Sequence, residues 1–241
     1  MNSHRVKPTS FDTLLDLACQ RKGSERNVIE LINSAWANPT FDNQDLAKIS
    51  DDIILSSLCR KIFQAGFVWR VVDAKWSGFE EVFWEFNIDK LILMPDDMLE
   101  SKARDTRIIR NLKKCWAIRD NALMISQTRQ REGKPFAQFI ADWPSDDIIG
   151  LWDFLKKNGT RLGGNTGAYA LRYIGKDSFL LSKDVEVYLR EAKIIDTGLH
   201  TKSALKNAQA FFNELHHQSH WSYRELSLLV AMSAGENFLQ V

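Results

Sequence analysis

The spacing of the apolar residues constrains this chain most, because they recur at three- and four-residue intervals along almost its whole length. This spacing is typical of helices that bury one face, and convincing alternation of apolar and polar residues, the mark of a half-buried strand, is absent. Pro95, Pro135 and Pro144 each stand where a first helical turn begins. We therefore expect an all-α fold. Helices are expected at 10–20, 25–37, 44–66, 76–86, 95–101, 105–130, 134–141, 145–157, 165–174, 183–193, 201–217 and 221–231.

Length and composition favour a compact enzyme-sized domain. With 241 residues, 44% of them hydrophobic and 26% charged, the chain can bury a sizeable core. No apolar run approaches the roughly 20 residues that span a bilayer, so no membrane segment is expected. We expect one two-lobed domain over residues 1–241, with its internal boundary at 129–135 and one lobe completed from both ends of the chain. A repeat architecture is not indicated.

Charge and cysteine usage suggest a reducing compartment and leave nucleic acid open as a partner. The segment Met1–Val6 lacks the pattern of a secretory signal, so we expect a cytoplasmic protein, nucleoid-associated if the source is bacterial. Three separated cysteines favour reduced thiols. The net charge of +1 neither proves nor excludes DNA binding, which needs only a local basic surface. The stretches 102–114 and 156–161 are basic, although a solvated helix face explains such runs equally well.

A first motif lies at Phe63–Trp69, at the end of an expected helix. Asp51 or Asp52 is expected to cap that helix. Gly66 permits close approach of another backbone or a flat ligand, and Trp69 offers a broad aromatic surface just where the chain leaves the helix. The motif therefore predicts a stacking wall, and the alternative is a tryptophan that only fills the core.

This motif and the later segment Asp105–Asn111, in this order, closely resemble two motifs of the 3-methyladenine DNA glycosylase I family. The resemblance covers roughly residues 50–190 and implies a two-lobed helical DNA repair enzyme. It implies that Trp69 lies in the pocket that receives a damaged base, with Phe67, Gln64 and Lys61 as further pocket residues. The family's zinc ligands have no evident match here, so no metal is expected. On the helix after the second motif, Asn111 and Asn121 are candidates for DNA contact or for plain solvent exposure.

Lys61 departs from the family pattern. In the family this position, three residues before the glutamine of the first motif, is a glutamate that reads the alkylated base. A lysine that faced the pocket would repel a cationic lesion. The reaction is therefore expected to follow the family, while the identity of the base stays open.

A second constellation lies between Lys156 and Leu171, where an expected helix runs into a glycine-rich turn and a new helix begins. It resembles a helix-hairpin-helix element over about 148–174. In such an element backbone N–H groups at the turn and at the next helix N-terminus bind a DNA phosphate. An ordinary glycine-bearing turn is the alternative, because an arginine stands where the first glycine of the pattern is expected. The predicted DNA-binding residues are Arg161, Gly163, Gly164, Asn165 and Thr166.

Asp184 is the expected catalytic residue. Helix-hairpin-helix glycosylases commonly carry a catalytic aspartate eighteen to twenty residues after the position matched by Asn165, and Asp184 follows Asn165 by nineteen. A carboxylate there stabilises the positive charge that develops on the sugar and orients the attacking water. Capping of the following helix is the structural alternative. Bifunctional members carry a lysine nucleophile where Asn165 stands. Lys183 and Lys61 are possible replacements, but neither falls at the expected place, so a monofunctional enzyme is expected.

The sequence thus predicts a monofunctional DNA glycosylase that hydrolyses the N-glycosidic bond of a damaged base, an alkylated purine, in double-stranded DNA. We expect a monomer that uses no cofactor; no cysteine array for an iron–sulfur cluster follows Cys115. The main alternative is a catalytically silent helix-hairpin-helix DNA-binding protein derived from a glycosylase. A helical protein-interaction module without a DNA role is the third hypothesis.

Overall fold

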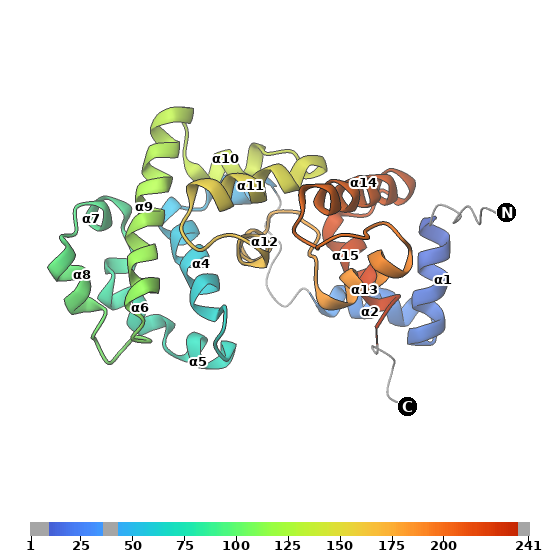
Figure 1. Ribbon diagram of the computed structural model, residues 1–241, viewed down its shortest axis with the longest axis horizontal. Helices are drawn as coiled ribbons and strands as arrows, with labels where there is room; N and C mark the ends of the chain where they lie inside the picture. The colour runs from blue at the N-terminus through green and yellow to red at the C-terminus, as the bar shows by residue number, and fades with distance from the viewer. Residues whose placement is uncertain (1–9, 36–42, 236–241) are drawn as a thin grey trace. The chain divides into compact units, whose positions relative to one another are not determined.

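The computed structural model describes residues 10–35 and 43–235. Within these ranges every regular element is a helix, so the expected all-α fold is confirmed (Figure 1). The segment Met1–Val6 and residues 36–37 of the helix expected at 25–37 lie outside the described residues. Among the helices described, none is both long and apolar enough to cross a membrane.

The chain divides into two compact units. The first comprises residues 1–39, 145–149 and 177–241, and the second comprises 40–144 and 150–176. The first unit therefore draws on both ends of the chain. The boundary expected at 129–135 is wrong, because this stretch lies inside the second unit. It comprises the end of one helix, which Gly133 terminates in a left-handed conformation (φ 65°), and the turn to the next helix.

The first unit is built around α15 (Tyr223–Met232). Ser222 begins this helix with a capping box, in which its hydroxyl accepts from the Glu225 N–H and the Glu225 carboxylate accepts from the Ser222 N–H. Leu226, Leu229 and Val230 are fully buried. The helices packed against α15 are α1 (Phe11–Lys22), α2 (Glu25–Ser34), α13 (Lys183–Glu191) and α14 (Lys202–Ser219), and η2 (Ser145–Asp147) contacts α14.

The second unit is built around α4 (Asp51–Gln64). Leu55, Leu58 and Phe63 of α4 are fully buried, so the helix forms the centre of this core. The other elements are α3 (Asn43–Lys48), α5 (Trp69–Ala74), α6 (Trp76–Val82), η1 (Trp84–Phe86), α7 (Ile88–Ile92), α8 (Asp96–Lys102), α9 (Leu112–Glu132), α10 (Phe136–Asp142), α11 (Ile148–Asn158), which starts in the first unit, and α12 (Asn165–Tyr173).

The two aspartates at the start of α4 do not cap it, which corrects the sequence prediction. Ser50 is the capping residue and accepts from the Ile53 N–H. Asp51 instead accepts from the first N–H groups of α10, those of Phe136 and Ala137, at 3.0 and 2.8 Å. Asp51 therefore joins two helices that are far apart in the sequence.

Several helix bounds differ from the expected ones for identifiable reasons. The helix expected at 44–66 is two helices, because Ser50 starts a new one. The helix expected at 105–130 begins only at Leu112, since the Asn111 side chain caps it by accepting from the Lys114 N–H. Both α5 and α7 were missed, because helices this short carry too few residues to show a period. The remaining expected helices shift by a few residues at most, except that 76–86 divides into α6 and η1 and that a 3-10 turn precedes α11.

The second motif has a folding role in the turn before α9. Asp105 accepts from both the backbone and the side chain of Arg107, and Arg107 also donates to Glu81 at 3.0 Å. The hydrogen bonds from the Arg107 side chain and backbone hold the pKa of Asp105 low, at about 2. Gly78 of α6 lies directly under this turn, and a Cβ there would come within 2.5 Å of the Arg107 carbonyl oxygen. The motif thus packs the turn onto α6.

Candidate functional site

Trp69 lies at the first position of α5, just after the loop that follows α4. Gly66 makes this loop possible by taking φ +80°, a conformation that other residues rarely adopt. The Trp69 side chain is 49% exposed, so it does not fill the core. Its ring meets the edge of Tyr169 on α12, with 5.9 Å between ring centres. An exposed indole held by a second ring is available for stacking.

Lys61 is buried beneath this indole. Its Nζ lies 4.9 Å from the centre of the Trp69 ring and 4.4 Å from that of Tyr173, and it donates to Gln64 Oε1 at 2.8 Å. Burial lowers the pKa of Lys61, the nearby Arg60 guanidinium lowers it further, and Asp73 opposes both effects. Of the four predicted pocket residues, Lys61, Gln64 and Trp69 are therefore brought together.

Asp73 connects the polar side chains around Trp69 by hydrogen bonds. Its Oδ1 accepts from Gln64 Nε2 and from Arg60 Nε, both at 2.8 Å, while Arg60 also donates to the Tyr173 hydroxyl at 3.0 Å. Neither tyrosine nor Arg60 was predicted from the sequence motifs. The available signal was the spacing of Tyr169 and Tyr173, four residues apart on the helix after the hairpin, which puts both on one face. We call the following set the Trp69 site: Arg60, Lys61, Gln64, Trp69, Asp73, Tyr169 and Tyr173.

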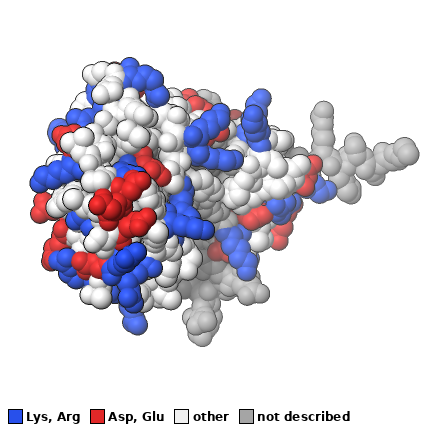
Figure 2. All heavy atoms as spheres, turned by 60° about the vertical axis from the view of Figure 1, so that its left-hand side comes forward, with Lys and Arg blue, Asp and Glu red and all other residues white. Residues whose placement is uncertain are grey.

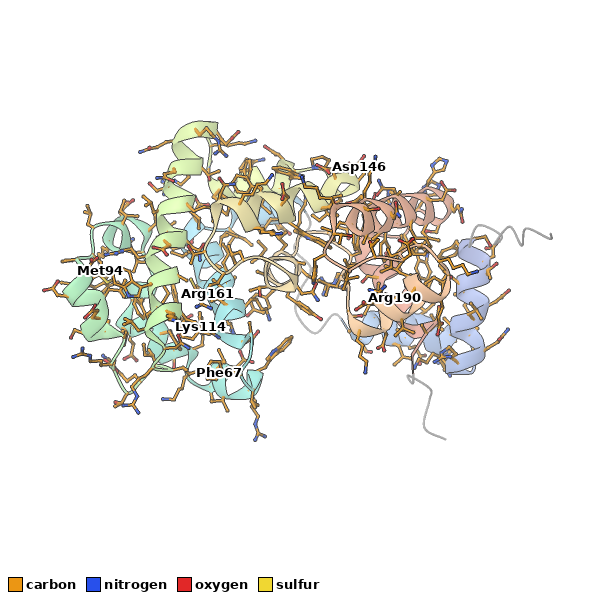
Figure 3. The ribbon with its side chains drawn as sticks, in the orientation of Figure 1. Phe67, Met94, Lys114, Asp146, Arg161 and Arg190 are labelled. Atoms are coloured by element: carbon orange, nitrogen blue, oxygen red, sulfur yellow. The ribbon has the colours of Figure 1, made fainter. Side chains whose placement is uncertain are left out.

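Phe67, the fourth predicted pocket residue, contacts a different lysine (Figure 3). Its ring is part of an exposed side chain, and Lys114 Nζ lies 4.5 Å from the ring centre. The same ammonium donates to the carbonyl oxygens of Phe63 and Ala65, at 3.1 and 2.7 Å, and so satisfies the end of α4. Burial and then the nearby Arg161 lower the pKa of Lys114. Phe67 therefore lies beside Lys114 of α9, whose pKa is in turn lowered by Arg161 of the hairpin turn.

The hairpin between α11 and α12 is packed too tightly for side chains at two of its glycines. A Cβ on Gly159 would lie 2.8 Å from the Leu155 carbonyl oxygen, and one on Gly167 would lie 2.7 Å from that of Leu162. Asn121 of α9 fixes the turn from outside. It accepts from the Thr160 N–H at 2.9 Å and donates to the Thr160 carbonyl at 3.1 Å.

Gly163 and Gly164 stand at the start of α12. Gly164 is the N-cap, with φ 59° and ψ −138°, a region essentially restricted to glycine, and the space beside it is open. Gly163 has less room, since a Cβ there would meet Lys156 Cγ at 3.4 Å. Arg161 is exposed and also has a positive φ, 63°. Asn165 and Thr166 open α12, so all five predicted DNA-binding residues lie at the turn or the helix start. Their contact with DNA stays a prediction.

Asp184 belongs to the first unit, in the first turn of α13. Ser182, not Asp184, caps this helix by accepting from the Val185 N–H at 3.3 Å. Asp184 is half-buried and close to Gly235, where an added Cβ would clash with its carboxylate. The Asp184 carboxylate also raises the pKa of Lys22. Burial and the nearby Arg21 have a larger effect and lower that pKa. The capping alternative is therefore wrong as stated, and catalysis by Asp184 stays a prediction.

Two hollows of the second unit lie away from Trp69. One, of about 840 Å³, is lined by residues that include Asp51, Asn87 and Arg129; the other, of about 700 Å³, is lined by residues that include Glu80 and Glu81. Trp69 lines neither. On the face drawn in Figure 2, basic and acidic side chains are interspersed. Within residues 10–35 and 43–235, no three His, Cys, Asp or Glu residues gather in a way that could hold a metal ion.

Solved structures with a similar fold are DNA glycosylases. The 8-oxoguanine DNA glycosylase of Methanocaldococcus jannaschii has a TM-score of 0.54 at 16% identity, over 91% of this chain and 92% of that one. The same enzyme with a 15mer DNA containing 8-oxoguanine, titled a glycosylase/lyase, gives 0.51 at 17% identity, over 90% and 95%. The 3-methyladenine DNA glycosylase I of Staphylococcus aureus gives 0.47 at 21% identity, over 58% and 80%. The chain therefore has a helical DNA glycosylase fold.

The family follows from the sequence comparison. The model of the methyladenine glycosylase family matches residues 23–157, more than half of the chain. The protein belongs to this family, as the two motifs predicted. A comparison with curated proteins finds no match.

Proposed function

We propose that this protein is a monofunctional DNA glycosylase of base excision repair, which hydrolyses the N-glycosidic bond of a damaged purine in double-stranded DNA. The observation that carries the proposal is the half-exposed indole of Trp69. This residue begins α5, and its ring packs against Tyr169 of α12. A glycosylase extrudes its target nucleotide and needs an aromatic surface to receive the base. The family membership supports this function, and an alkylated purine is the lesion that the family suggests.

The proposed reaction combines phosphate binding, base stacking and hydrolysis. The N–H groups at Gly163 and Gly164 bind a backbone phosphate, while the extruded base stacks on Trp69. The bond between the sugar C1′ and the base nitrogen breaks, the base leaves with that electron pair and takes up a proton, and the sugar becomes cationic. The Asp184 carboxylate stabilises this charge and orients the attacking water. The water oxygen bonds to C1′ while one of its O–H bonds breaks, and the proton released balances the one that the base takes up. We propose that the protein acts as a cytoplasmic or nucleoid-associated monomer.

Base release from a panel of damaged duplexes tests the proposal. The wild-type chain is expected to leave an abasic site at one lesion, and Trp69→Ala to lose most of that release while it keeps its fold. Borohydride is expected to trap no covalent complex, since Asn165 offers no amine. Trp116→Ala is a matched control, because this half-exposed tryptophan lies on α9. Release by Trp69→Ala at the native rate would contradict the proposal.

One observation favours a second function, that of a silent DNA-binding protein. Lys61 puts an ammonium between two rings of the site where a base would stack. A protein of this kind would bind duplex through the hairpin and release no base from any lesion. The same duplex panel, read once for binding and once for release, separates the two functions.

A further inference from the structure

The Trp69 site already holds a cation of its own. The Lys61 ammonium lies over two aromatic rings, 4.4 Å from the centre of Tyr173 and 4.9 Å from that of Trp69. The faces of aromatic rings are electron-rich and attract cations. Because Lys61 is only 9% exposed, its ammonium occupies this position from the inside while the Trp69 ring remains open to solvent.

The other charges of the site do not cancel this cation. Asp73 is the one carboxylate in the set, and it is 2.8 Å from a guanidinium nitrogen of Arg60. Gln64 stands between Asp73 and Lys61, donating to the carboxylate and accepting from the ammonium. Two cations and one anion leave an excess positive charge. A charged base that stacked on Trp69 would therefore face a like charge in a partly desolvated place.

The ammonium also has unused hydrogen-bonding capacity. A lysine carries three N–H donors, and Lys61 directs one hydrogen bond, to Gln64 Oε1. The two ring faces near the ammonium are weaker partners than a carbonyl oxygen or a ring nitrogen. A base that brings such an acceptor to Lys61 gains a charge-assisted hydrogen bond.

We propose that the Trp69 site selects neutral damaged purines that present an acceptor atom to Lys61, and rejects purines that carry a fixed positive charge. Hypoxanthine and 1,N6-ethenoadenine belong to the first class, and N3- and N7-alkylated purines in DNA belong to the second. The proposal rests on the function proposed above in taking the Trp69 site to bind the base. It makes Lys61 a residue that determines specificity.

Small probes test this choice without any base release. The full chain is titrated with 3,9-dimethyladeninium, a fixed cation, and with 9-methylhypoxanthine and 9-methyl-1,N6-ethenoadenine, both neutral, by ligand-observed NMR. The wild-type protein is expected to bind at least one neutral probe tenfold or more tightly than the cation. Trp69→Ala is expected to abolish that binding, which locates it.

Two variants of the lysine then assign the selectivity. Lys61→Gln and Lys61→Met remove the charge with little change of length, and each is expected to reduce the neutral-to-cation preference tenfold or more. Melting curves show whether each is folded, and one folded variant suffices. Lys75→Gln is the matched control: it makes the same charge change on a lysine outside the site, which donates to the Thr106 carbonyl, and its preference is expected to equal that of the wild type.

Three outcomes would overturn the proposal: a wild-type preference for the cation, no binding of either neutral probe, or an unchanged preference in a folded Lys61 variant. Failure of the glycosylase function gives a different pattern. Selective binding of neutral probes without base release from any duplex would leave this inference standing and contradict the enzyme. Release of cationic purines together with a preference for the cationic probe would do the reverse.

Discussion

Asn121 and Thr160 are joined by two hydrogen bonds, in which the Asn121 amide accepts from the Thr160 N–H at 2.9 Å and donates to the Thr160 carbonyl at 3.1 Å. Asn121 is fully buried on α9, and Thr160 lies in the hairpin turn. One side chain therefore satisfies both backbone groups of a turn residue, as a neighbouring strand would. The hairpin is fixed by a helix that precedes it by about forty positions in the chain.

Asn121→Ala is expected to destabilise the protein by about 1–3 kcal/mol, because it leaves the Thr160 N–H and carbonyl without these partners. Urea unfolding measures the loss. Asn158→Ala is the control: it removes an exposed asparagine that donates to the Phe154 carbonyl on the same hairpin. That variant is expected to stay within about 0.5 kcal/mol of the wild type. Equal stabilities for the two variants would show that Asn121 does not hold the turn.

Gly164→Ala is expected to weaken duplex binding and to destabilise the fold by about 1–3 kcal/mol, since φ 59° with ψ −138° is strained for any other residue. Binding is measured by fluorescence anisotropy at fixed salt. Gly133→Ala is the control for backbone strain, because Gly133 has φ 65° at the end of α9, outside the hairpin. Its stability is expected to fall while its affinity for duplex does not. If Gly133→Ala weakens binding as much as Gly164→Ala, the hairpin is not the phosphate site.

The architecture was largely predictable because it depends on local pattern. Apolar spacing gave the long helices, and the two motifs gave the family. The expected helix starts and capping residues were wrong where a capping side chain comes from a distant part of the chain. Asp51, for example, caps α10, while Ser50 caps α4. The unit boundary failed because glycine and polar residues also end a helix inside a compact unit, as Gly133 does.

Only those site residues that lie within one sequence motif could be predicted. The first motif named Trp69, Gln64 and Lys61, but Tyr173 reaches Lys61 from a helix more than a hundred residues later. Two tyrosines four residues apart look like any half-buried helix face until the partner helix is known. Asn121 shows the same limit, since a buried structural role cannot be told from a solvent-facing one by its residue type.

The stability of the protein is expected to depend on the ionisation of Lys61. The folded state lowers its pKa below the ordinary value of 10.5, mainly through burial, so the unfolded chain binds more protons just below pH 10.5. Stability therefore rises with pH through this window and is lost as the pH falls through it. Other lysines change in the same direction, so the measurement is the difference in unfolding free energy between the wild type and Lys61→Met. That difference is expected to grow in favour of the wild type up to pH 10.5, and a flat difference would contradict the assignment.

Asp184→Asn is expected to reduce base release on a proven substrate by 10²-fold or more while duplex binding survives. Asparagine keeps the shape of the side chain beside Gly235 but removes the charge that stabilises a cationic sugar. Single-turnover release measures the chemistry, and anisotropy measures binding.

Glu186→Gln is the control in the same turn of α13, because it removes an equal charge from a carboxylate that pairs with Arg190 four residues on. Its release rate is expected to stay within a few-fold of the wild type. Asp184 also raises the pKa of Lys22 within the first unit, so its charge has an effect apart from catalysis. Were Asp184 only structural, Asp184→Asn would lower the melting temperature and leave the release rate per folded molecule unchanged, and the catalytic assignment would then be wrong.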